Sequence, residues 1–112
     1  MIPVLEPIFA SKAAERVLLY LENYGEGHAA GIARTFACPL SGVQKQLRKF
    51  ELAGVLVCRP VGRTRLYAWN PRYALRIPLR ALLLATLNLL SRDEIRRYYR
   101  ERRRPRRAGK PL

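Results

Sequence analysis

The stretch that decides the fold is residues 39–52, which read PLSGVQKQLRKFEL. Pro39 lacks a backbone N–H and therefore suits the first turn of a helix, where that group has no partner. The apolar residues of the stretch fall within one arc of a helix: Leu40, Val43, Leu47 and Phe50. The other side carries Ser41, Lys45, Arg48 and Lys49. We therefore predict a helix over 39–52 with one buried face and one basic face.

Two helices are predicted upstream of this stretch. Ser11 can cap a first helix that runs to about Tyr24 and is ended by the glycines in 25–27. Its apolar stripe consists of Ala14, Val17, Leu18 and Leu21. A short second helix is predicted over 28–36, and a break at 37–39 separates it from the basic-faced helix.

A β-hairpin is predicted downstream. Gly54 can end the basic-faced helix in a left-handed conformation. Residues 55–59 and 65–69 are rich in β-branched and aromatic side chains, which favour strands, and 60–64 is predicted to be the loop between them. Arg63 and Arg65 would place positive charge at the tip of this hairpin.

A leucine-rich helix is predicted over 78–90. Its apolar residues spread over an arc far wider than the roughly 100° that one neighbour covers. The segment is shorter than the ~20 residues needed to span a bilayer, so we expect a second copy of the chain to cover the excess and no membrane contact. The residues assigned to dimerisation are Leu79, Leu82, Leu83, Leu87 and Leu90.

The chain is predicted to end in a short helix and a basic tail. Ser91-Arg92-Asp93-Glu94 matches a capping box and predicts a last helix, on which Ile95, Tyr98 and Tyr99 share a face. The arginine-rich run that begins at Arg100 is expected to contact phosphates without sequence preference. Residues 105–112 are expected to be disordered.

Charge favours a polyanionic partner. The 112 residues contain 22 Lys and Arg against 8 Asp and Glu, a net charge of +14. The segment 34–65 is basic in its own right, because Glu51 is its only acid. Residues 1–10 do not resemble a signal peptide, and Cys38 and Cys58 suit a reduced compartment, so we expect a cytoplasmic protein.

Enzymatic chemistry is not expected. The sequence lacks a nucleophile elbow, a phosphate-binding loop and an obvious pair of catalytic acids. Cys38, Cys58 and the lone His28 are scattered along the chain, whereas a closed structural zinc site needs four ligands. We therefore expect no metal and no cofactor.

Several motifs together resemble a known family. They are residues 8–12 (IFASK), 32–36 (IARTF), 43–50 (VQKQLRKF), 53–55 (AGV) and 61–63 (VGR), followed by Tyr67 and Asn70-Pro71. In order and spacing over roughly residues 5–90 they resemble the ArsR-type winged-helix transcriptional regulators of prokaryotes. The resemblance implies a mainly α fold with a small β-hairpin: a winged helix-turn-helix with a C-terminal dimerisation helix. It divides the chain into a DNA-binding domain (1–74), a dimerisation segment (75–104) and the tail (105–112).

The resemblance also implies a homodimer on double-stranded DNA. It assigns contacts at or near the bases to Ser41, Gly42, Gln44 and Lys45. Arg48 and Lys49 would lie closer to phosphates, and Arg63 and Arg65 would belong to a wing over about 59–66. Gln44 is the best candidate for sequence readout, because its amide can donate to and accept from adenine in the major groove.

Two other functions fit the sequence. A compact and very basic chain with an arginine-rich end could bind structured RNA through shape and phosphates. The same scaffold could also be an adaptor that binds another protein. Competition between RNA and duplex DNA at matched salt distinguishes RNA binding from binding to duplex DNA. Charge reversal at Lys45 and Arg48 distinguishes the adaptor from a protein that binds DNA through the helix over 39–52.

Overall fold

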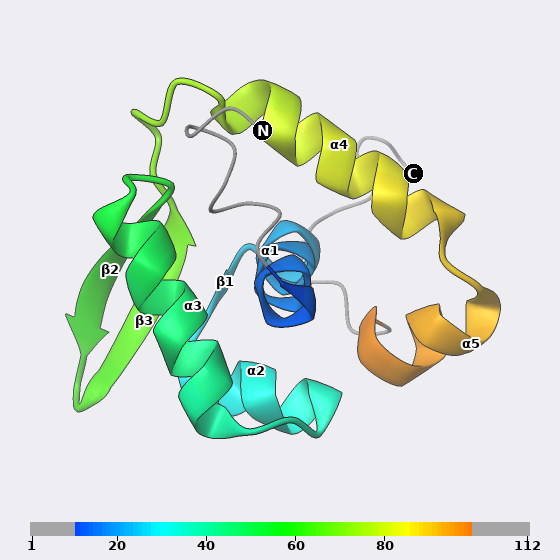
Figure 1. Cartoon of the computed structure of the whole chain (residues 1–112), viewed down its shortest axis with the longest axis horizontal. Helices are drawn as coiled ribbons and strands as arrows, with labels where there is room; N and C mark the ends of the chain where they lie inside the picture. The colour runs from blue at the N-terminus through cyan, green and yellow to red at the C-terminus, as the bar shows by residue number, and fades with distance from the viewer. Residues whose placement is uncertain (1–10, 100–112) are drawn as a thin grey trace.

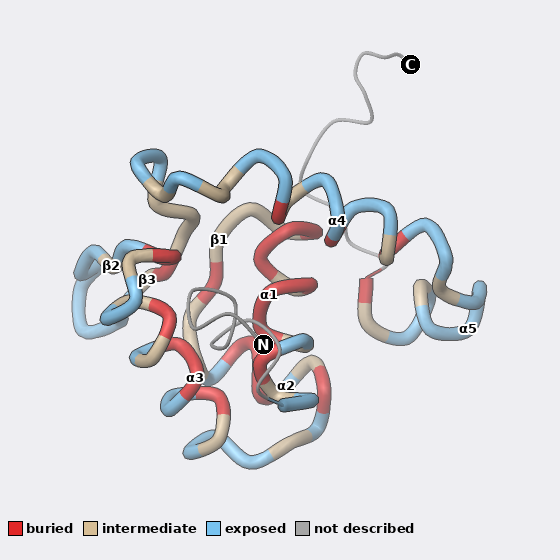
Figure 2. Tube along the Cα trace, turned by 45° about the horizontal axis from the view of Figure 1, so that its top comes forward, coloured by how far each residue is buried: buried red, intermediate tan, exposed pale blue. Residues whose placement is uncertain are grey.

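Helix α1 (Lys12–Tyr24) lies at the centre of the structure, and the other elements surround it (Figure 1). The structure is a computed structural model, and it describes residues 11–99. Ser11 caps α1 by accepting a hydrogen bond from the N–H of Ala14, as its sequence predicts. Helix α1 packs against α2 (Ala29–Phe36), α3 (Leu40–Leu52) and α4 (Arg76–Leu89). It therefore organises a single hydrophobic core, whose buried residues concentrate on the inward sides of the helices (Figure 2).

A sharp turn sets α3 against α2. Ala37 adopts a left-handed conformation (φ 52°), and the N–H of Cys38 bonds to the carbonyl of Ala33 at 3.0 Å, which closes the end of α2. Pro39 is the N-cap of α3 and does not belong to its first turn, so the helix begins one residue later than predicted. Both cysteines of the chain, Cys38 and Cys58, are free thiols.

The sheet is larger than the sequence predicts. Strands β2 (Leu56–Val61) and β3 (Thr64–Trp69) pair antiparallel and leave only Gly62 and Arg63 in the turn, where Gly62 has φ +63°. The predicted five-residue loop is therefore wrong. Proline is tolerated within β2 because this strand lies at the edge of the sheet. The predicted helix terminator at Gly27 is instead part of a third strand, β1 (Glu26–Gly27), which pairs with β3.

Helix α4 covers α1 with one of its faces, and this corrects the dimer assignment. Leu79, Leu83 and Leu87 are buried within their own chain, so they are not free to meet a second copy. Leu90 follows the last helical residue as the C-cap and packs against the same core. Leu82 alone of the five assigned leucines remains exposed. The helix also begins two residues earlier than predicted, because Pro78 falls in its first turn, where no N–H is needed.

The C-terminal part folds back onto α1 and α2. Ser91 and Glu94 form the predicted capping box at the start of α5 (Arg92–Glu94). The chain then continues as a π-helical turn, η1 (Ile95–Tyr99), where an ordinary helix was expected. The Tyr24 hydroxyl donates to the carbonyl of Tyr98 at 2.6 Å, and the Asn23 amide donates to that of Tyr99 at 3.3 Å. These bonds hold the end of the described chain against α1.

The observed architecture is mainly helical with a small three-stranded antiparallel sheet in the order β1-β3-β2. It is compatible with a winged-helix-like fold. None of the helices between residues 11 and 99 is long and apolar enough to cross a bilayer. The tail from Arg100 and the predicted disorder over 105–112 lie outside the described residues.

Two leucines of α3 allow a matched test of this fold. Leu47 is fully buried, whereas Leu52, five residues later, is 81% exposed. We expect Leu47→Ala to lower the free energy of unfolding by about 2–5 kcal/mol, because it leaves a cavity in the core. Leu52→Ala, which removes the same atoms, should change it by less than about 0.5 kcal/mol. Urea unfolding followed by circular dichroism measures both, and equal losses would contradict the orientation of α3.

Candidate nucleic-acid interface

A groove of about 700 Å³ separates α3 from the tip of the β2–β3 hairpin and the start of α2. Its walls bring together residues that are up to 39 positions apart in the sequence. They are His28, Ala29, Ala30, Ser41, Gln44, Lys45, Leu47, Arg48, Arg63, Thr64, Arg65 and Tyr67. Six of the eight residues that the sequence assigns to DNA contact belong to this set, so the fold gathers them at one place.

Helix α3 presents its polar side to the groove because its other side is anchored in the core. Val43, Leu47 and Phe50 are buried, and they pack with α1 and α2 in the core. Leu40 was predicted on the same face but is exposed. Lys45 and Arg48 are exposed, and they make no hydrogen bond or ion pair with the described residues. Their charges are therefore available to a ligand in the groove.

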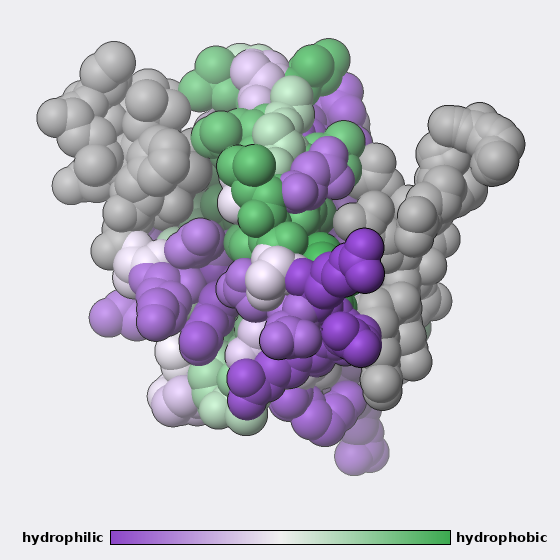
Figure 3. All heavy atoms as spheres, turned by 90° about the vertical axis from the view of Figure 1, so that its right-hand side faces the viewer, coloured by the Kyte–Doolittle hydropathy of each residue, from purple (hydrophilic) through white to green (hydrophobic). Residues whose placement is uncertain are grey.

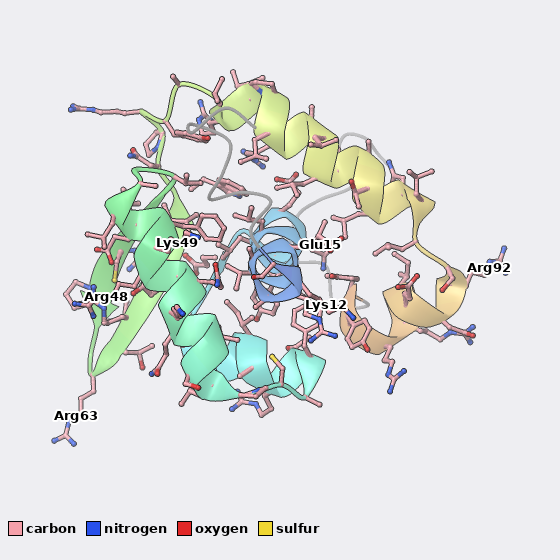
Figure 4. The ribbon with its side chains drawn as sticks, in the orientation of Figure 1. Lys12, Glu15, Arg48, Lys49, Arg63 and Arg92 are labelled. Atoms are coloured by element: carbon pink, nitrogen blue, oxygen red, sulfur yellow. The ribbon has the colours of Figure 1, made fainter. Side chains whose placement is uncertain are left out.

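The hairpin contributes a free arginine at its tip. Arg63 extends away from the body of the molecule, and Arg48 lies on the side of α3 that faces the hairpin (Figure 4). Arg63 is exposed and has no partner within residues 11–99. Gly62 precedes it in a left-handed conformation that most side chains resist, so the two-residue turn depends on this glycine.

Arg65 differs from Arg63 because its exposed side chain is bonded to other residues of the protein. Its guanidinium donates to the Tyr67 hydroxyl and to the Glu51 carboxylate, each at 3.3 Å, and lies over the Tyr67 ring. The hydrogen bond to Tyr67 and the neighbouring Glu51 raise the pKa of Arg65 above its usual value. Arg65 thus connects the hairpin to the end of α3, and its charge is partly neutralised.

A second ion pair fixes the hairpin from the other side. Arg59 on β2 reaches across β3 to the carboxylate of Glu26 on β1, at 3.4 Å. Glu26 and Glu51 are therefore both engaged with arginines of the hairpin. Since exposed pairs of this kind contribute little to stability, their effect here is chiefly on where the charges lie.

The start of α2 completes the groove, and the sequence did not indicate this part. His28 is the N-cap of α2 but makes no capping hydrogen bond with its side chain. Ala29 and Ala30, the first residues of the helix, line the groove, and no side chain of the N-cap residue compensates the partial positive charge of this helix end. An N-terminus without a strong capping residue is the signal that could have pointed to them.

Two assigned residues lie outside the groove lining. Gly42 and Lys49 are both half-buried on α3 and are not among the residues that line the groove. A Cβ added at Gly42 would meet no atom within 4 Å, so the position faces open space.

The groove lining contains four arginines and lysines and no aspartate or glutamate. Its electrostatics therefore favour an anionic ligand.

No protein-family model matches the chain, and no curated protein matches it. Among residues 11–99, no three His, Cys, Asp or Glu side chains are grouped so that they could hold a metal ion.

Proposed function

We propose that this chain binds double-stranded DNA sequence-specifically, as a dimeric winged helix-turn-helix transcriptional regulator without enzymatic activity. The observation that carries the proposal is the groove between α3 and the hairpin, whose lining contains no acidic residue. Within residues 11–99, its Lys45, Arg48 and Arg63 side chains form no ion pair. The resemblance of its motifs to ArsR-type regulators supports the same function.

The shape of the groove walls suits a duplex. The major groove of B-DNA admits one α-helix, and α3 offers an exposed polar face along Ser41, Gln44 and Lys45. Gln44 would read an adenine edge through its amide. Arg63 would then contact the phosphate backbone or the minor groove, and the N-terminus of α2 would face a phosphate. Contacts to bases and to phosphates would thus come from different elements.

The proposed dimer uses the outward side of α4. Ala81 is exposed there, one turn after the exposed Ile77 and one turn before the exposed Leu84, and Ala85, also exposed, follows Leu84. Small residues flanked by large apolar ones allow a second helix to approach closely. An apolar surface covers α4 above the hydrophilic surface of α5 (Figure 3). A paired copy would cover this surface and present two α3 helices to a pseudo-palindromic site.

Selection of bound sequences from a random duplex pool at physiological salt tests the proposed function directly. We expect an enriched motif with two related half-sites about one helical turn apart, or a multiple of it. RNA that outcompetes every duplex at matched salt would favour an RNA-binding protein instead.

Charge reversal tests whether α3 is the reading helix. We expect Lys45→Glu with Arg48→Glu to weaken binding to the selected duplex by about 100-fold or more, because both base and phosphate contacts are lost. The matched control is Lys12→Glu with Arg72→Glu, which makes the same change of charge at exposed positions outside the groove. Fluorescence anisotropy measures both variants. If the two losses are equal, net charge and not α3 determines binding.

The two hairpin arginines should differ in salt dependence. Each phosphate contact adds about 0.9 to the slope of log affinity against log salt concentration. We expect Arg63→Ala to reduce that slope by about one such contact. Arg65→Ala should change it less, because Glu51 already pairs with this guanidinium. Binding isotherms at four or five salt concentrations give the slopes, and a larger effect at Arg65 would reverse the assignment.

A glutamate on the outward side of α4 should separate the dimer. We expect Leu84→Glu to give monomers at micromolar concentration, because a buried charge without a partner opposes association. Leu52→Glu on α3 is the control, since this leucine is also exposed but lies on another helix. Sedimentation velocity measures the mass of each variant. A dimer that persists in Leu84→Glu would contradict this interface.

A further inference from the structure

A second groove, of about 400 Å³, lies between α1 and α4, outside the candidate nucleic-acid interface. Its floor is apolar and consists of Leu18, Leu19, Leu79 and Leu83, which are buried. Its rim consists of Ser11 and Glu15 on α1 and of Leu82 and Thr86 on α4. Leu82 is 49% exposed although it borders this apolar floor, so the groove can take up further apolar side chains.

The position of Ser11 indicates what can reach this groove. Ser11 is the N-cap of α1, with an extended backbone, and it is itself a rim residue. The ten residues that precede Ser11 in the sequence, MIPVLEPIFA, are therefore joined to the described structure at a rim residue of the groove. A segment tethered at this point has an effective concentration in the millimolar range, by comparison with short flexible linkers, without a second molecule.

The composition of those ten residues fits an apolar groove. They include Ile2, Val4, Leu5, Ile8 and Phe9, and Glu6 is their only charged side chain, in a chain that is 27% charged. Pro3 and Pro7 restrict the backbone, which reduces the conformational entropy that would be lost on ordering.

The length is also sufficient. Ten extended residues span about 33 Å, whereas the 14 residues of α4 extend over about 21 Å. We propose that residues 2–9 of the same chain occupy the groove between α1 and α4, with Ile8 and Phe9 nearest to its mouth. The inference does not depend on DNA binding, because the groove shares no residue with the nucleic-acid interface.

Thiol labelling of the full-length protein tests the proposal. Leu82→Cys is compared with Val57→Cys, which is exposed to a similar extent at 41% but lies on β2, and Cys38 and Cys58 are replaced by alanine in both. We expect iodoacetamide to modify Leu82→Cys at about one tenth of the rate at Val57→Cys, or at a lower rate, because labelling at Leu82→Cys then requires the segment to leave the groove. Adding Ile8→Asp and Phe9→Asp should remove this protection and leave the rate at Val57→Cys unchanged.

Three results would overturn the proposal. Leu82→Cys could react as fast as Val57→Cys while residues 1–10 are unaltered. The double aspartate change could leave the protection in place. Protection could also fall on dilution, which would assign the groove to a second copy of the chain.

A disulfide experiment gives an independent readout that does not require charged substitutions. Phe9→Cys with Leu82→Cys should oxidise to a disulfide within one chain, whereas Phe9→Cys with Val57→Cys should not. Mass spectrometry of the non-reduced protein distinguishes a bridge within a chain from one between chains. Failure of the first pair to form an intrachain bridge, or equal bridging of both pairs, would contradict the proposal.

Discussion

The burial of one face of α3 against the core is the constraint on which the candidate site depends. Val43, Leu47 and Phe50 anchor the helix in the core. Because side chains at three- and four-residue spacing share a face, anchoring these three fixes the opposite direction for Gln44, Lys45 and Arg48. The apolar residues thus determine where the polar ones point. A substitution that loosened the core would therefore alter the positions of these polar side chains without replacing any of them.

Acidic residues complete the site by engaging some of the arginines around it. Glu51 pairs with Arg65 and Glu26 with Arg59, whereas Arg63 at the tip of the hairpin has no such partner among residues 11–99. Exposed pairs of this kind are weak. They nevertheless decide which guanidiniums keep their full charge and which lie along the protein surface. The hairpin is therefore attached to α3 and β1 at its sides and is positively charged at its tip.

Local sequence predicted most elements but not the pairings between distant ones. Helical periodicity and capping residues located α1, α2, α3 and the capping box at Ser91, because these signals lie within a few residues of each other. The two residues of β1 carry no periodicity, and Pro60 indicated a loop because its edge position arises only in the folded sheet. The partners of Arg65 and the leucines of α4 that face α1 likewise depend on tertiary packing. The residues of the groove could therefore be named individually, whereas the contribution of α2 could not.

The distribution of charge connects the stability of the fold to its proposed ligand. A net charge of +14 on 112 residues is self-repulsive, and the groove concentrates positive side chains with no acid among its lining residues. A bound polyanion would reduce this repulsion between the positive side chains, and the same side chains would attract the polyanion. Salt screens both the repulsion within the protein and the attraction to the polyanion. It should therefore raise the stability of the unbound protein while it weakens binding. Opposite responses to salt are thus expected from one cause: the arginines and lysines that repel one another in the free protein are those that would attract a phosphate backbone.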